Sequence, residues 1–135
     1  MKPAELMIND WVMFQDPDTQ ETEMHQIEQD DFTGSDGFFH MFIGVPILEE
    51  MFNFNGFSEH KDLDEVATYL NEAEDYLLEL QAYKEGDHWR FRIQRGPEAV
   101  VSIKARYVHE LQHAMRLMGL YDMADNFKVQ KGGDR

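Results

Sequence analysis

Two histidines and a glutamate near the carboxyl end of the chain have the spacing of a zinc-hydrolase motif. Residues 109–113 read H-E-L-Q-H, so His109 and His113 are one helical turn apart and Glu110 follows the first of them. On a helix this pattern presents two imidazole ligands and a carboxylate that can act as general base on metal-bound water. The motif raises the hypothesis of a zinc-dependent hydrolase with Glu110 as catalytic base and Asp122 as the available third ligand.

The neighbours of these histidines favour a different interpretation. On a helical wheel, Arg106 and Arg116 lie on the same face, one turn before and one turn after the histidine pair. Permanently charged guanidinium groups disfavour a dication and the neutral imidazoles that it requires. No histidine or glutamate follows His113 to complete a ligand set. We therefore predict no metal or other cofactor, and expect an interaction surface made by Arg106, His109, His113 and Arg116.

The opposite face of the same helix is apolar. It carries Tyr107, Leu111, Ala114, Met115 and Met118. Such a stripe predicts an amphipathic helix, from about Lys104 to Leu120, that packs its apolar side on a sheet and turns both histidines outward.

Alternating patterns elsewhere predict an α+β fold. N-terminal strands, SH3-like in arrangement, are expected at residues 8–14, within 21–29 and at 38–43. A short central helix is predicted over 47–54, with Asn55-Gly56 as its C-cap.

The second half of the sequence has a clearer pattern. The helical spacing of Leu63, Val66, Ala67 and Leu70 predicts a short acidic helix between residues 58 and 75. An antiparallel three-stranded meander follows, in which Trp89, Phe91 and Ile93 share one face. The polar stretch QKGGDR at residues 130–135 predicts a flexible tail over about residues 129–135.

Composition is that of a folded globular protein. The chain has 135 residues, 42% of them hydrophobic and 13% aromatic, which suits one domain spanning residues 1–135. It has no cysteine, and this excludes disulfides, thiolate metal ligands and cysteine nucleophiles. With neither a long apolar run nor a signal peptide in the sequence, we expect a cytoplasmic protein that does not associate with membranes.

Charge is distributed unevenly along the chain. The formal net charge is −15, and residues 1–64 carry 15 acidic residues against only Lys2 and Lys61. This field opposes direct binding to nucleic acid and suits an unknown, basic protein partner. Two alternatives remain: a homodimer that pairs acidic and basic halves, and an acidic mimic of the nucleic-acid backbone.

Two further clusters are candidate sites. Asp30, Asp31 and Asp36 form an acidic loop with oxygen ligands that Ca²⁺ or Mg²⁺ prefers, but without the regular spacing of a calcium loop. A basic stripe is formed by Arg90, Arg92, Arg95 and Lys104. We expect the stripe to balance the acidic half, either within the fold or across a dimer.

Three stretches together match a known pattern. "MKPAELMINDWV" resembles M-K-x-x-x-L-x-I-G-x-W-V, "GVPILEEMFNFNGF" resembles P-I-x-L-T-x-E-x-L-x-x-x-G-F, and "IKARYVHELQHAMRLMGL" resembles I-K-Y-V-H-E/Q-L-Q-x-L. In this order they resemble a family of small uncharacterised bacterial proteins of prophage and mobile-element neighbourhoods. The closing helix of that family can carry H-x-L-Q-N, which implies that zinc is not obligatory.

Taken together, these features predict a non-enzymatic protein-interaction or regulatory module of a mobile-element type. The zinc hydrolase built on His109, Glu110 and His113 is the main alternative, and the acidic mimic is the other.

Overall fold

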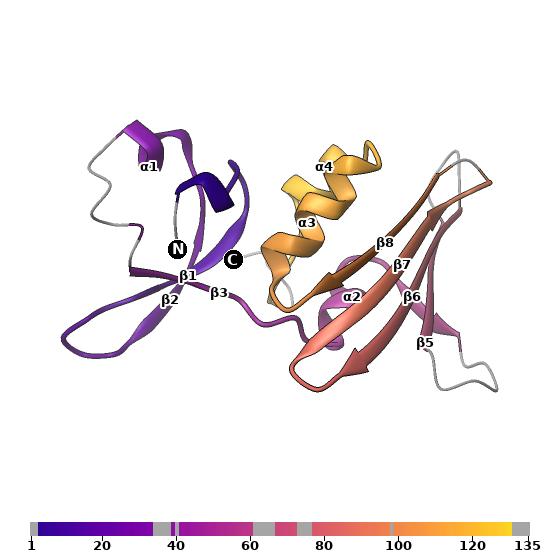
Figure 1. Cartoon of the computed structure of the whole chain (residues 1–135), viewed down its shortest axis with the longest axis horizontal. Helices are drawn as coiled ribbons and strands as arrows, with labels where there is room; N and C mark the ends of the chain where they lie inside the picture. Colours follow the sequence, from indigo (N-terminus) through magenta and orange to yellow (C-terminus); the bar gives the residue numbers. More distant parts are fainter. Residues whose placement is uncertain are drawn as a thin grey trace.

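The computed structural model contains both helices and strands, which confirms the predicted α+β class (Figure 1). It describes residues 3–33, 39, 41–60, 67–72, 77–97 and 99–130. Over these ranges the strands form two antiparallel sheets, one of three strands and one of five.

The three-stranded sheet comes from the N-terminal part of the chain. A 3-10 turn, η1 (Pro3–Glu5), precedes β1 (Trp11–Gln15), which pairs with β2 (Thr22–Gln26) and with β3 (Phe42–Gly44) in the order β2-β1-β3. The β1–β2 hairpin turns at Asp16, whose Oδ1 accepts hydrogen bonds from the amides of Asp18 and Thr19. Helix α1 (Gln29–Thr33) follows the hairpin.

The five-stranded sheet contains the predicted meander. It is formed by β4 (Ser58–His60), β5 (Ala67–Glu72), β6 (Leu77–Glu85), β7 (His88–Arg95) and β8 (Ala99–Ala105), in sequential order. The predicted helix between residues 58 and 75 is wrong, because β4 and β5 occupy the described part of that range. The buried Tyr69 explains the difference, since its ring packs at 4.8 Å from that of Phe52 while β5 pairs with β6. Leu63 and Val66 lie outside the described residues.

Three short helices complete the described part of this region. Helix α2 (Glu50–Phe54) begins later than predicted, and Gly56 after it has the expected positive φ of 86°. Helix α3 (Val108–Leu117) is shorter than predicted, because β8 extends to Ala105 and Gly119, with φ 80°, follows its last turn. A further helix, α4 (Tyr121–Asp125), was not predicted.

Two apolar clusters hold the sheets. The larger lies between one face of the five-stranded sheet and helices α2 and α3. Trp89, Phe91 and Ile93 share this face, as predicted, and are buried. The smaller joins Leu6, Val12, Ile27, Phe39 and Phe42 around the N-terminal sheet. Val129, at the start of the predicted flexible tail, is 8% exposed and belongs to the larger cluster. Residues 131–135 of that tail lie outside the described part, so the tail stays a prediction. No helix found in the described ranges is long and apolar enough to cross a membrane.

Candidate functional site

Helix α3 lies between the two sheets and is covered on two sides. Leu111, Ala114 and Met115 are buried in the larger core, as the helical wheel predicts. The opposite side contacts β1, so that His109 is only 6% exposed and Arg116 only 8%. The prediction that all four polar residues of this helix face outward is therefore wrong for these two, whereas the side chains of Arg106 and His113 remain 49% and 31% exposed.

Asp10 explains the burial of Arg116. The carboxylate of Asp10 is 0% exposed; its Oδ1 lies 2.6 Å from Nη1 of Arg116, and its Oδ2 lies 2.5 Å from Nε2 of His113. The amide of Met7 also donates to Oδ2, at 2.8 Å. Arg116 is further held by Asp125, at 3.2 Å. A buried carboxylate and guanidinium thus satisfy each other at the joint between the N-terminal sheet and α3.

Gln112, which lies within the H-E-x-x-H motif, connects α3 to the N-terminal sheet through hydrogen bonds with backbone groups. Its side chain is 0% exposed; Oε1 accepts from the Trp11 amide at 2.9 Å, and Nε2 donates to the carbonyls of Asn9 and Ala124 at 2.9 and 2.8 Å. Asn9 has a φ of 75°, in the left-handed region, and Gln26 donates to the same carbonyl. Gln112, the second of the two variable positions in the motif, is therefore a buried structural residue.

Glu110 caps the first turn of α3. Its Oε1 accepts hydrogen bonds from the amides of Arg106 and Tyr107, at 2.9 and 3.0 Å. The Tyr107 amide is the backbone donor of the N-cap residue, which the N3 carboxylate of a capping box accepts, and the Arg106 amide precedes it. A carboxylate at this end is also favoured by the helix dipole. Glu110, the residue proposed as a general base, therefore caps the first turn of α3.

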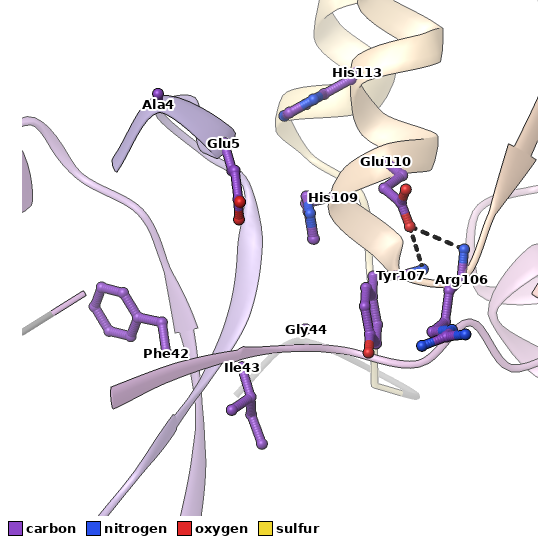
Figure 2. Close-up of a pocket in the computed structure, with 10 residues that line it drawn as sticks. All are labelled: Ala4, Glu5, Phe42, Ile43, Gly44, Arg106, Tyr107, His109, Glu110 and His113. Atoms are coloured by element: carbon purple, nitrogen blue, oxygen red, sulfur yellow. Dashed lines mark hydrogen bonds between the residues drawn. The ribbon is translucent and has the colours of Figure 1, made fainter. Parts of the chain in front are cut away.

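An open cleft of about 770 Å³ lies beside this first turn (Figure 2). Phe42, Ile43 and Gly44 of β3 line it along one side, and Glu5 of η1 faces His109 of α3 across it. It is lined in addition by Ala4, Arg106, Tyr107, Glu110 and His113. The cleft is therefore lined by the histidines of α3, by the residues of β3, and by both acidic and basic side chains.

The Tyr107 ring and the backbone of Gly44 fix the cleft where the two sheets meet. A Cβ on Gly44 would lie within 2.7 Å of three ring carbons of Tyr107, so only glycine allows this approach. The chain then continues from Gly44 to bond with the start of α3, since the amide of Val108 donates to the Val45 carbonyl at 2.8 Å.

His109 is the least satisfied polar group at the cleft. Its Nδ1 is buried and has no hydrogen-bond partner in the described part of the chain. Desolvation by burial lowers the pKa of His109 below the ordinary 6.5, and the Asp10 carboxylate offsets only part of this effect. The imidazole is therefore neutral at neutral pH and able to accept one hydrogen bond.

The zinc arrangement is not assembled by these residues. His113 is directed at Asp10, its ring centroid lies 5.7 Å from that of His109, and Glu110 is engaged by two amides. Asp122 lies exposed on α4 and does not line the cleft. Within the described ranges, no group of three histidine or carboxylate side chains is placed to hold a metal ion.

The structure describes part of the predicted acidic loop and all of the predicted basic stripe. Asp31 accepts from the Glu28 amide at 2.7 Å and lies 3.0 Å from His25, while Asp36 is outside the described residues. Arg90, Arg92 and Lys104 share the face of the five-stranded sheet that points away from the core. Arg95 does not, because it donates to the Met118 carbonyl at the end of α3.

Comparison with family models, with curated proteins and with solved structures finds no match to the chain. The resemblance to the mobile-element family and the SH3-like arrangement of the N-terminal strands therefore stay predictions.

Proposed function

We propose that the protein is a non-enzymatic interaction module, and that its cleft beside α3 receives an extended segment of a partner protein. The observation that carries the proposal is the position of β3, which is an edge strand of its sheet and lines the cleft with three residues. An extended segment adds to such an edge through main-chain hydrogen bonds, while neighbouring pockets select its side chains.

The chemistry of the walls favours a segment with apolar and basic residues. Ile43 and Phe42 supply apolar contacts, and the carboxylates of Glu5 and Glu110 lie on the two sides. The cation at the rim, Arg106, already pairs with Asp87 at 2.6 Å. Together with the net charge of −15, this favours approach of a basic partner.

The polar residues of the H-E-x-x-H motif support a binding role over hydrolysis. Glu110 starts α3 and His113 contacts the buried Asp10, so both groups would have to leave structural partners in order to activate water. Breaking such contacts costs stability, and the motif alone supplies no third ligand.

The proposal is tested with a display library of random linear peptides. We expect enrichment of peptides that combine apolar residues with Lys or Arg, and a loss of at least about tenfold in their affinity for Ile43→Lys, which places a like charge in the cleft. Ser102→Lys adds the same charge on the outer face of the other sheet and is the matched control. No enrichment, or equal binding to both variants, would refute the proposal.

Elemental analysis of the purified protein tests the main alternative. Zinc bound at one equivalent and lost in His109→Ala, together with peptide cleavage that disappears in Glu110→Gln, would establish the hydrolase instead.

A further inference from the structure

The outer face of the five-stranded sheet carries a compact cationic surface. Along β7 the residues alternate, with Trp89, Phe91 and Ile93 buried in the core and Arg90 and Arg92 exposed on the other side. With their neighbours on β6 and β8 they line a shallow groove of about 500 Å³. We call this surface the basic face, and it consists of Gln81, Tyr83, Arg90, Arg92, Ser102 and Lys104.

Two cations of the basic face are placed directly opposite each other. In the antiparallel pairing of β7 and β8, Arg90 is the register partner of Lys104, and Tyr83 of β6 is opposite Arg90 on the other side. Like charges in direct cross-strand positions destabilise a sheet unless an anion lies between them. Among the residues that the structure describes, the one carboxylate paired with these cations is Glu85, at 3.4 Å from Nε of Arg90, in an exposed pair of little strength.

A matching anionic surface is present at the other end of the molecule. Between residues 3 and 60 the sequence has no Lys or Arg. The β1–β2 hairpin exposes Asp18, Glu21 and Glu23, and in the described part of the chain none of them pairs with a lysine or arginine.

The acidic β1–β2 hairpin cannot contact the basic face of its own chain. It extends from the N-terminal sheet away from the five-stranded sheet, and α3 lies between the two sheets (Figure 1). The basic face opens on the side of β6–β8 opposite to α3, because the side facing α3 is the buried one.

From this complementarity we propose that the chain self-associates, with the acidic β1–β2 hairpin of one copy lying in the groove of the basic face of another. A second copy supplies carboxylates on a protruding hairpin at the same concentration as the groove itself. Complementary potentials steer such a contact and fix its orientation. A nucleic acid is the less suitable occupant, because its phosphates approach a protein of net charge −15 against the overall field.

The contact joins two different surfaces, so it is either reciprocated in a closed dimer or propagated in a longer assembly. It does not rest on the cleft beside α3, and the Ile43→Lys variant should self-associate like the wild type.

Sedimentation equilibrium of the full chain tests the proposal. We expect the wild type, 15.9 kDa as a monomer, to form larger species at low salt and to dissociate as salt is raised. Two charge-reversed variants, Arg92→Glu/Lys104→Glu and Asp18→Lys/Glu21→Lys, should each associate about 100-fold more weakly, since each places like charges against each other.

Mixing the two variants provides the decisive result. In the mixture, the unchanged hairpin of the first fits the unchanged basic face of the second, and the reversed surfaces fit each other, so we expect mixed assemblies from two monomeric proteins. Circular dichroism checks that both variants fold, and Arg92→Gln/Lys104→Gln replaces the first if it does not.

Three outcomes would overturn the proposal. The first is a wild type that remains monomeric at concentrations up to about 0.5 mM. The second is self-association that survives both charge reversals, and the third is a mixture that stays monomeric. A monomeric wild type that binds a single-stranded oligonucleotide through Arg92 and Lys104 would assign the basic face to nucleic acid.

Discussion

Replacing Asp10 by asparagine should destabilise the protein far more than an ordinary loss of one surface carboxylate. Asp10 is fully buried and accepts from three donors, Arg116, His113 and the Met7 amide. Asparagine has nearly the same shape, so the substitution removes charge and acceptor capacity with little change in packing. What remains is the Arg116 guanidinium, whose side chain is 7% exposed and whose one other acidic partner in the described part of the chain is Asp125.

The expected magnitude follows from this geometry. Removing one partner of a buried ion pair costs about 3–5 kcal/mol, because the other charge stays buried without compensation. Asp125, with its side chain 36% exposed, is partly screened by water and recovers only a fraction of this. We therefore expect Asp10→Asn to lower the free energy of unfolding by about 3 kcal/mol, a large share of the roughly 5–15 kcal/mol available to a domain.

Urea denaturation followed by circular dichroism measures this loss at neutral pH. Asp18→Asn, on the exposed hairpin, is the matched control and should change stability by less than about 0.5 kcal/mol. The double variant Asp10→Leu/Arg116→Met should be more stable than Asp10→Asn, because it removes the orphaned charge. A loss below about 1 kcal/mol for Asp10→Asn, with an unchanged m-value, would refute the view that this carboxylate anchors α3.

Three other perturbations have defined outcomes. Gly44→Ala should destabilise by about 1–3 kcal/mol through overlap with the Tyr107 ring, and Tyr107→Ala in the same chain should relieve most of the overlap, as thermal unfolding will report. Glu110→Ala should cost about 1 kcal/mol by removing the cap of α3, whereas Glu110→Gln should keep most of it; equal losses in chemical denaturation would contradict the capping role. Burial lowers the pKa of His109, so the unfolded chain takes up a proton near pH 6.5 that the folded chain accepts only at lower pH. Its contribution to stability is complete above pH 6.5 and is lost as the pH falls, and urea midpoints should decline less steeply below pH 6.5 in His109→Phe than in the wild type.

The sequence predicted α3 well on one side and wrongly on the other, for a physical reason. The apolar stripe of Leu111, Ala114 and Met115 identifies the face that a sheet covers. This stripe carries no information about the N-terminal sheet, which covers the opposite side of α3 through polar contacts. Arg116 is buried because a carboxylate 106 residues earlier is buried with it, and neither residue alone has a local pattern that reveals the other.

The strand β5 shows the opposite difficulty. Its apolar residues have spacing that also fits a helix, and local spacing cannot distinguish the two when a segment is short. The outcome is decided by β6, which offers six register partners to β5, and by the space beside Phe52 that Tyr69 fills. The meander was predictable because its long strands alternate over β6 and β7 and are joined by the tight turn at Gly86.

The placement of α3 also bears on how the cleft can discriminate among partners. One wall includes Phe42 of the smaller apolar cluster, and the other is formed by α3, whose opposite side packs in the larger cluster. The two walls are joined by the contacts of Asp10, Gln112 and Trp11. Hydrogen bonds and buried ion pairs depend on direction and distance more strongly than apolar contacts do. The width of the cleft is therefore set by groups that tolerate little displacement. A substitution that weakens this joint, such as Asp10→Asn, should reduce affinity for a peptide in the cleft at urea concentrations where both sheets are still folded, because the walls separate before either core is lost.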